Sequence, residues 1–297
     1  MPYILLIMTT LFWSGNFVLS RGMNAQIPPI TLSFWRWAVA LLILSSFAFK
    51  HLYIQREIAI RHKKFIIMQG LLGVTGFNSL IYLALQSTTA INAVLVNSCI
   101  PVIIVIISWG IYNERLSFRQ CIGVCISFSG VILIISGGNI STLVRLQYNH
   151  GDVLVFIAAV VWALYSVNLK RYPQELHPLA YLSAIVIVGL IALLPFYVLE
   201  LFSGKTMVLT VNSVITIIYV ALFASVLAFI FWNRAIAEVG ANIAGPFIHL
   251  MPVFSTILAV IFLGETLTAN HLQAIPFIFG GIMLTTFRPP GKVALQK

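Results

Sequence analysis

Charged side chains are scarce in this chain of 297 residues, and acidic ones are the scarcest. Asp, Glu, Lys and Arg together make up 8% of the sequence, and only 7 residues are Asp or Glu. Soluble globular domains carry roughly 25% charged residues, so the composition excludes a water-soluble fold. Apolar residues make up 60% of the chain, enough for many membrane-spanning helices of about 20 residues each.

Motifs of enzymes and nucleotide-driven transporters are also missing. The chain has no G-x-x-x-x-G-K-[ST] loop, which argues against direct use of ATP hydrolysis. Cys99, Cys121 and Cys125 lie in apolar runs, where neither a disulfide framework nor a thiolate metal site is expected. No catalytic constellation is found, and carboxylates lie only near the ends of apolar runs. The sequence therefore predicts no enzyme, no metal site and no cofactor.

Apolar runs punctuated by Gly, Pro, Asn and charged residues predict an all-α polytopic membrane protein with ten transmembrane helices. The expected spans are 2–20, 30–49, 65–85, 91–111, 119–136, 152–170, 178–202, 212–233, 241–263 and 270–287. The outer end of the fourth span stays open, because Thr88 to Asn92 could belong either to the loop or to the helix.

The net charge of +10 reflects membrane topology rather than binding of nucleic acid. With both termini in the cytoplasm, 13 of the 17 Lys and Arg residues fall on the cytoplasmic side, as the positive-inside rule requires. The exceptions are Arg21, Arg145 and Lys205 outside and Arg36 within the second helix. The expected partners are a small-molecule substrate and the lipid bilayer. The sequence does not predict the oligomeric state, and a monomer is one of the options.

The chain also repeats itself. Residues 88–134 can be laid without a gap on residues 239–285. This places Pro101 on Pro252, Glu114 on Glu265 and Gly130 on Gly281. Each half, 1–143 and 144–297, then holds five helices. Because five is odd, the second half enters from the opposite face, and the two halves are expected to form inverted repeats about an axis in the membrane plane.

Inverted repeats predict a central substrate site near the bilayer midplane, lined by polar and aromatic side chains. Trp13 and Asn16 share one helix face, and Trp162 and Tyr165 share a face in the equivalent helix. The further substrate-binding candidates are Asn78, Tyr82, Asn97, Ser98, Phe229, Asn233 and His249.

Structural roles compete with substrate binding at these positions. The two tryptophans could be interfacial anchors or packing residues, and the amides could join helix to helix. His249 could be a packing residue rather than a proton carrier. Pro101 and Pro252 lie within predicted helices, where proline loosens the hydrogen-bonded ladder, so both are candidates for gating or kink positions.

Arg36 is the one basic residue well inside a predicted helix. Such a residue could snorkel outward, pair within the protein or bind a substrate carboxylate. Glu265, near the outer end of the ninth helix, is a candidate partner. Arg36 and Glu265 are therefore predicted to be structural charges.

Several short segments carry a family resemblance. They are Phe12-Trp13-Ser14-Gly15-Asn16-Phe17, Pro28-Pro29 followed by Phe34-Trp35-Arg36-Trp37, and Pro252-Val253 followed by Leu263-Gly264-Glu265-Thr266-Leu267 and Gly280-Gly281. Together they resemble the EamA family of the drug/metabolite transporter superfamily, over both halves. The first half departs from the pattern, with Tyr112-Asn113-Glu114 where Leu-Gly-Glu is usual.

The resemblance implies a permease of the bacterial inner membrane that works by alternating access. Exporters of amino acids, or of similar small zwitterionic or amphipathic metabolites, are frequent in this family. Two alternatives stay open: a proton-coupled multidrug efflux transporter and a non-transporting membrane sensor or scaffold. The multidrug relatives use a carboxylate in their first helix, and residues 2–20 contain none.

Overall fold

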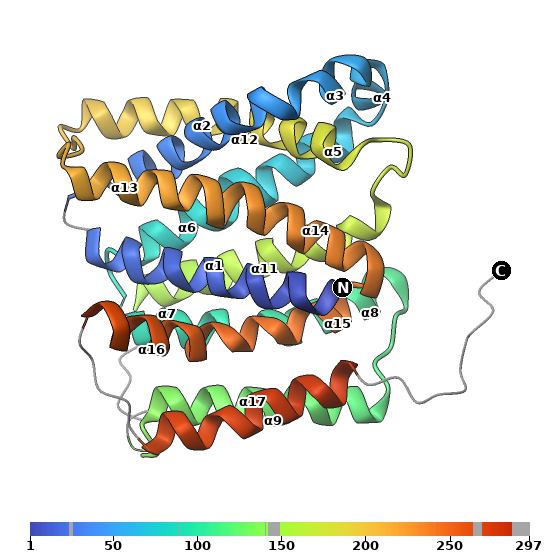
Figure 1. Cartoon of the computed structure of the whole chain (residues 1–297), viewed down its shortest axis with the longest axis vertical. Helices are drawn as coiled ribbons and strands as arrows, with labels where there is room; N and C mark the ends of the chain where they lie inside the picture. The colour runs from blue at the N-terminus through green and yellow to red at the C-terminus, as the bar shows by residue number, and fades with distance from the viewer. Residues whose placement is uncertain (24–25, 89, 140, 142–148, 264–268, 287–297) are drawn as a thin grey trace.

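Helices joined by turns and short loops make up the described part of the chain in the computed structural model (Figure 1). It describes residues 1–23, 26–88, 90–139, 141, 149–263 and 269–286, and no strand occurs among them. The elements are α1 (Pro2–Met23), α2 (Pro29–Phe47), α3 (Phe49–Ile54), α4 (Arg56–Arg61), α5 (Lys63–Gln69), η1 (Gly70–Gly76), α6 (Phe77–Ala84), α7 (Ala90–Asn97), α8 (Ile100–Tyr112), α9 (Phe118–Ser136), α11 (His150–Asn168), η2 (Leu169–Arg171), α12 (Pro178–Phe202), α13 (Val211–Tyr219), η3 (Val220–Leu227), α14 (Ala228–Val239), α15 (Ala241–Ala244), η4 (Gly245–His249), α16 (Leu250–Leu263) and α17 (Ala269–Thr286).

Nine stretches of the described residues are long and apolar enough to cross a membrane. They match the first nine predicted spans, with most ends shifted by only a few residues. The eighth span is the longest and runs past residue 233 to Val239. Its last turn is held by an Arg234–Glu238 pair with Nε–Oε1 at 3.2 Å, so it ends in a charged turn. α17 is a further long helix, with a polar first turn.

Helix ends follow the capping preferences of their residues. Ser117, Asn149 and Thr210 each form a capping box at the start of a long helix. Asn113 closes α8 in the left-handed conformation at φ 53°, where the short polar side chain of Asn is tolerated. The fourth span, whose outer end the sequence leaves open, has its first described helical residue at Ala90.

One helix end is capped by a different helix. Glu200, near the end of α12, accepts hydrogen bonds from the backbone N–H of Ile30 (3.2 Å) and of Thr31 (2.6 Å). A carboxylate at a helix N-terminus satisfies free donors and complements the helix dipole. Glu200 therefore fixes the start of α2 against α12.

Several of the described spans contain irregular helical segments. The third and eighth spans each contain a π-helical segment, η1 and η3. The fourth span is interrupted between α7 and α8, directly before Pro101. The ninth begins with the short α15 and passes through η4, a 3₁₀ segment, shortly before Pro252. π segments and 3₁₀ stretches inside long helices often mark functional positions.

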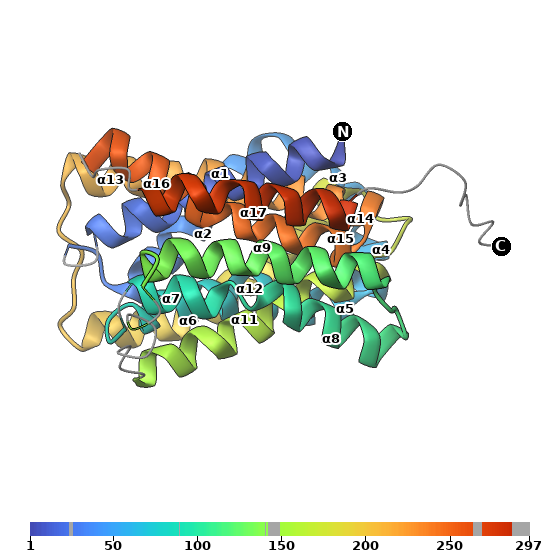
Figure 2. The same cartoon turned by 90° about the horizontal axis from the view of Figure 1, so that it is seen from below.

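The helices lie side by side in a bundle. α2 packs on α12 along one edge, and α9 packs on α17 along the other (Figures 1 and 2). α1 and α11 run between these edges, and the start of α1 lies at the same end of the bundle as the end of α17 (Figure 1).

α9 and α17 approach each other very closely. A Cβ atom added at Gly123 would lie 2.6 Å from the backbone oxygen of Gly281, so this crossing requires glycine. Small residues that let two backbones meet are typical of helix contacts in membranes. The small-residue face of the fifth helix thus packs within the chain.

Candidate functional site

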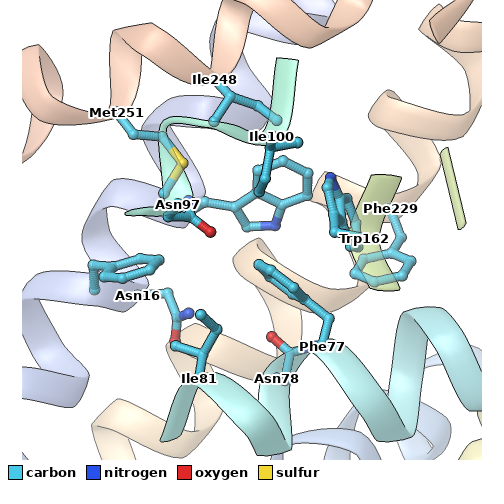
Figure 3. A pocket seen from close by; sticks show the side chains of 12 residues that line it. Asn16, Phe77, Asn78, Ile81, Asn97, Ile100, Trp162, Phe229, Ile248 and Met251 are labelled. Carbon is cyan, nitrogen blue, oxygen red and sulfur yellow. The ribbon is translucent and has the colours of Figure 1, made fainter. Parts of the chain in front are cut away.

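A small cavity lies at the centre of the bundle, where helices of both halves meet (Figure 3). Its lining side chains are mostly apolar or aromatic, with three asparagines among them. They are Trp13, Asn16, Phe17, Phe77, Asn78, Ile81, Asn97, Ile100, Trp162, Phe229, Ile248 and Met251. The volume open to the centres of water-sized spheres is about 20 Å³, which is room for about one water molecule.

Aromatic rings form the apolar wall of the cavity. The rings of Trp13 and Trp162 meet edge to face, with centroids 5.0 Å apart. Phe77 and Phe229 also contact Trp162, at 4.9 and 5.5 Å between centroids. Trp13 is held in place because its Nε1 donates to the backbone oxygen of Ala224 at 3.1 Å. The rings of the wall are therefore packed against one another beside the cavity.

Arg36 lies behind the asparagine side of the cavity and is 1% exposed. Its Nε donates to Ser225 Oγ at 2.5 Å, and its Nη2 donates to the oxygen of Ala224 at 2.8 Å. Its Nη1 donates to Asn78 Oδ1 at 2.7 Å and to Tyr82 Oη at 3.0 Å. All four acceptors are neutral, and no described carboxylate pairs with Arg36.

A buried cation without a counter-ion is costly in a membrane protein. The four hydrogen bonds offset part of that cost, and they also join α2 to α6 and η3. Such a residue is a functional-site candidate by default.

The π-helical turn of η3 supplies part of this arrangement. The oxygen of Ala224 accepts from both Trp13 and Arg36. Ser225 Oγ donates back to the oxygen of Val220 at 2.8 Å. The wider π turn re-aims backbone carbonyls away from regular helical bonds, so η3 offers its backbone to groups from α1 and α2.

The three cavity asparagines differ in their partners. Asn16 Oδ1 accepts from Tyr82 Oη at 3.0 Å and from Ser20 Oγ at 3.1 Å. Asn78 Oδ1 accepts from Arg36, as given above. Asn97 is 5% exposed, yet its Oδ1 has no hydrogen-bond partner among the described residues. An unpaired buried acceptor costs free energy and calls for a donor from outside the fold.

Comparison with known proteins identifies the family. The profile of the EamA-like transporter family matches residues 1–136 and 149–287. The chain belongs to the EamA-like transporter family. This confirms the resemblance found in the sequence, and it makes the chain a multi-pass membrane protein of a transporter family.

Individual relatives of this EamA-like transporter agree. It is 28% identical over 261 residues to the uncharacterized transporter YyaM of Bacillus subtilis (strain 168), covering 86% of this chain and 84% of YyaM. It is 24% identical over 184 residues to a probable amino-acid metabolite efflux pump of Salmonella typhimurium, covering 60% of each chain. One solved crystal structure is 17% identical and has a TM-score of 0.78, with 95% of this chain and 95% of that chain covered. This likeness shows the fold.

The EamA-like transporter brings many of the predicted substrate-binding residues together. Trp13, Asn16, Asn78, Asn97, Trp162 and Phe229 all line the central cavity. Tyr82 lies directly behind the lining and bonds to both Asn16 and Arg36.

The other predicted substrate-binding residues lie away from the cavity lining. Tyr165 donates to Asn233 Oδ1 at 2.8 Å. Ser98 Oγ donates to the oxygen of Val94 within its own helix at 2.7 Å. His249 is fully buried, with Nδ1 2.7 Å from Ser127 Oγ and Nε2 3.0 Å from the oxygen of Ser98. Both ring nitrogens of His249 are thus occupied within the protein.

The remaining predicted positions concern kinks and charges. Pro101 lies in the first turn of α8, directly after the interruption of the fourth span. Pro252 lies near the start of α16. Glu265 lies outside the described residues. Arg36 is held by neutral groups from α6 and η3, as given above.

The sequence prediction did not include six of the lining residues, all of them apolar. Among these six, only Phe17 could have been found from the sequence, because it shares a helix face with Trp13. Phe77, Ile81, Ile100, Ile248 and Met251 are ordinary apolar residues within apolar helices. The backbone acceptor at Ala224 was also missed, because a π-helical turn leaves no mark in composition.

Proposed function

We propose that this EamA-like transporter exports amino acids, or similar small zwitterionic or amphipathic metabolites, by alternating access across the bacterial inner membrane. The observation that carries the proposal is the central cavity, with its aromatic wall, its amides and a buried arginine behind them. Such a site offers apolar contact to a side chain and hydrogen bonds to a small polar group. The probable amino-acid metabolite efflux pump of Salmonella typhimurium supports the same substrate class.

The proposed architecture has ten transmembrane helices in two inverted five-helix repeats, 1–143 and 144–297. Two observations support it. The family profile matches two segments, 1–136 and 149–287. π segments also occur in the third and eighth spans alike. With cytoplasmic termini, the basic helices α3 and α4 lie on the cytoplasmic side, in keeping with the positive-inside rule.

The cavity must widen during transport. Ligand sites of proteins usually measure about 300–1,000 Å³, whereas this cavity has room for about one water molecule. The π segments, the interruption before Pro101 and the 3₁₀ segment before Pro252 all lie in spans that line the cavity. Long helices bend at such irregular turns. In the proposed cycle these turns let the two halves rock around the central site.

Proton-coupled export of cationic drugs is the less favoured reading. A buried carboxylate would be expected at such a site, and none lines the cavity among the described residues. The cation nearest the cavity, Arg36, would repel a positively charged drug.

Counterflow in liposomes tests the proposed function. Purified protein is reconstituted with each of the common amino acids inside, and uptake of the same labelled amino acid is measured. Saturable uptake of at least one amino acid is expected. Binding of amino acids without flux would indicate a sensor, and proton-driven uptake of a cationic dye with no amino-acid flux would indicate multidrug efflux; either result overturns the proposal.

A matched pair of variants on α8 serves as a control. Ile100 is 1% exposed and lines the cavity, so Ile100→Trp is expected to block it and abolish counterflow. Ile106 is 58% exposed, so Ile106→Trp is expected to leave counterflow intact. Thermal unfolding of both variants distinguishes a blocked site from a misfolded protein.

A further inference from the structure

The two ends of the central cavity differ in the kind of hydrogen-bonding group that they leave free. One end is formed by α1 and α6 with Arg36 behind it. The other is formed by Asn97 at the end of α7, on the far side of the cavity from Asn78 (Figure 3). The difference follows from which atoms of each asparagine are already bonded inside the protein.

Arg36 sets the direction of the hydrogen bonds at its end. A guanidinium only donates, so Tyr82 Oη and Asn78 Oδ1 must act as acceptors toward it. Tyr82 then has its own proton to donate, and it donates to Asn16 Oδ1. Ser20 Oγ donates to the same oxygen.

Asn16 therefore shows its N–H groups to the cavity. Its Oδ1 already accepts two bonds, whereas its Nδ2 donates to no described group. Asn78 keeps one N–H free, because its Oδ1 accepts from Arg36 and its Nδ2 makes one bond, of 3.4 Å, to the oxygen of Gly73. This end thus offers donors in front of a buried positive charge, which is a setting for an anionic group.

The opposite end offers an acceptor. Asn97 Oδ1 is buried and has no described partner, and Figure 3 shows it pointing toward the centre of the cavity. The rings of Trp13 and Trp162 line the same cavity. Carbonyl oxygens and aromatic faces both attract ammonium groups.

We propose that the cavity binds an α-amino acid in one orientation, with the carboxylate at Asn16 and Asn78 in front of Arg36 and the ammonium at Asn97 Oδ1. This rests on the proposed transport of amino acids. Selectivity then requires both charges on the ligand, and Arg36 acts as a specificity-determining residue through Tyr82 and the two asparagines.

Competition in the counterflow assay tests this orientation. The best-transported amino acid is compared with its carboxamide, its decarboxylated amine and the corresponding 2-hydroxy acid, each as a competitor of known concentration. Hydrogen bonds to charged groups are worth about 1.5–3 kcal/mol, so wild type is expected to favour the amino acid over its carboxamide and over its hydroxy acid by about 10- to 100-fold.

Variants at the two ends should give opposite patterns. Arg36→Gln is expected to weaken binding of the amino acid and hydroxy acid about 10-fold or more, with the amine and the carboxamide nearly unchanged. Arg36→Lys is expected to restore part of the preference. Asn97→Leu should weaken the amino acid, the amine and the carboxamide while sparing the hydroxy acid, and Asn97→Asp should favour the amine.

Ser79→Ala is the control. Ser79 lies on α6 beside Asn78, and the change removes a buried hydrogen bond to Ser33 of α2 without touching this network. Equal loss of all ligands in Arg36→Gln, with no rescue by Arg36→Lys, would overturn the orientation and leave a structural role. If wild type gives no amino-acid counterflow at all, the proposed function itself fails. The two failures are therefore distinguishable.

Discussion

The first and second halves of this chain, 1–143 and 144–297, contribute different chemical groups to the central cavity. Both halves have a π segment in their third helix and an irregular turn before a proline in their fourth. The polar groups at the cavity nevertheless all come from the first half: Asn16, Asn78 and Asn97, with Arg36 behind them. The second half contributes Trp162, Phe229, Ile248 and Met251, all apolar or aromatic.

In the proposed inverted-repeat architecture, this difference would let two related halves bind an asymmetric ligand. The irregular helix turns occur in both halves, whereas the side chains that line the cavity differ between them. The second half supports Arg36 through η3, with the hydroxyl of Ser225 and the backbone oxygen of Ala224.

The largest effect is expected on the apolar wall. Trp162→Ala removes ring contacts with Trp13, Phe77 and Phe229, so the free energy of unfolding should fall by about 3–5 kcal/mol. The control is Trp109, which is 53% exposed on α8. Trp109→Ala should change the free energy of unfolding by about 0.5 kcal/mol at most. Unfolding in detergent micelles measures both. Similar effects from the two variants would show that the wall is not a packed structural element.

The next largest effect concerns the asparagine side of the cavity, where Asn78 accepts from Arg36. Asn78→Leu takes the acceptor from Arg36 Nη1 at 2.7 Å and leaves a buried charge with one bond fewer, which should cost about 1.5–3 kcal/mol of unfolding free energy. The neighbouring Ser79→Ala, which loses only the bond to Ser33, should cost about 1 kcal/mol. Chemical denaturation in micelles gives the comparison. An Asn78→Leu variant as stable as Ser79→Ala would mean that Arg36 does not depend on Asn78.

A smaller effect separates the halves by the same chemical change. Tyr82→Phe and Tyr165→Phe each remove one buried hydroxyl and its bond to an asparagine, and Tyr165→Phe should cost about 1 kcal/mol. The Tyr82 hydroxyl also accepts from Arg36 Nη1, which keeps its bond to Asn78, so Tyr82→Phe should cost about 1.5 kcal/mol. Only Tyr82→Phe should reduce the preference for an amino acid over its carboxamide, because only Tyr82 links Arg36 to Asn16. Competition in counterflow measures that preference, and a reduced preference in both variants would contradict the division of roles.

The smallest effect lies where the halves meet at one end of the bundle. The rings of His51 and His177 stack with centroids 3.9 Å apart. Partial burial and the nearby His51 lower the pKa of His177 below its usual 6.5, so the folded protein binds this proton more weakly than the unfolded chain does. The stabilisation is therefore present above pH 6.5 and is lost as pH falls below it.

Thermal unfolding between about pH 8 and about pH 5.5 checks this sign. The unfolding temperature should fall slightly on acidification, and less so in His51→Phe, which keeps a stacked ring without its charge. Glu175 lies nearby, and its bond to His62 lowers its pKa. The contribution of Glu175 to the free energy of unfolding is lost only at more acidic pH, as the carboxylate becomes protonated. A rise in stability on acidification would contradict the assignment.

Much of the fold follows from the sequence because the bilayer demands long apolar segments. The spans and the all-helical class follow from composition, and the shared face of Trp13 and Asn16 follows from helical spacing. Trp13 and Trp162, both predicted to face the site, meet edge to face; the equivalence of their helices stays a prediction.

The rest depends on rotations and partners that spacing does not encode. Arg36 could turn outward, pair or face the site, and only the packed helices show that it is held by Asn78, Tyr82 and η3. His249 is a candidate for substrate binding in the sequence, yet its ring bonds to Ser127 on α9. The π segments are invisible in sequence because an apolar run suits an α turn equally well.

The most direct test of the central claim is an experimental structure of the protein with its best-transported amino acid bound in the widened cavity. The carboxylate is expected within hydrogen-bonding distance, about 3 Å, of the amide nitrogens of Asn16 and Asn78, with the ammonium against Asn97 Oδ1. The substrate side chain should then lie against Trp162 and Phe229. The reversed orientation, with the carboxylate at Asn97, or binding outside the central cavity, would contradict the account.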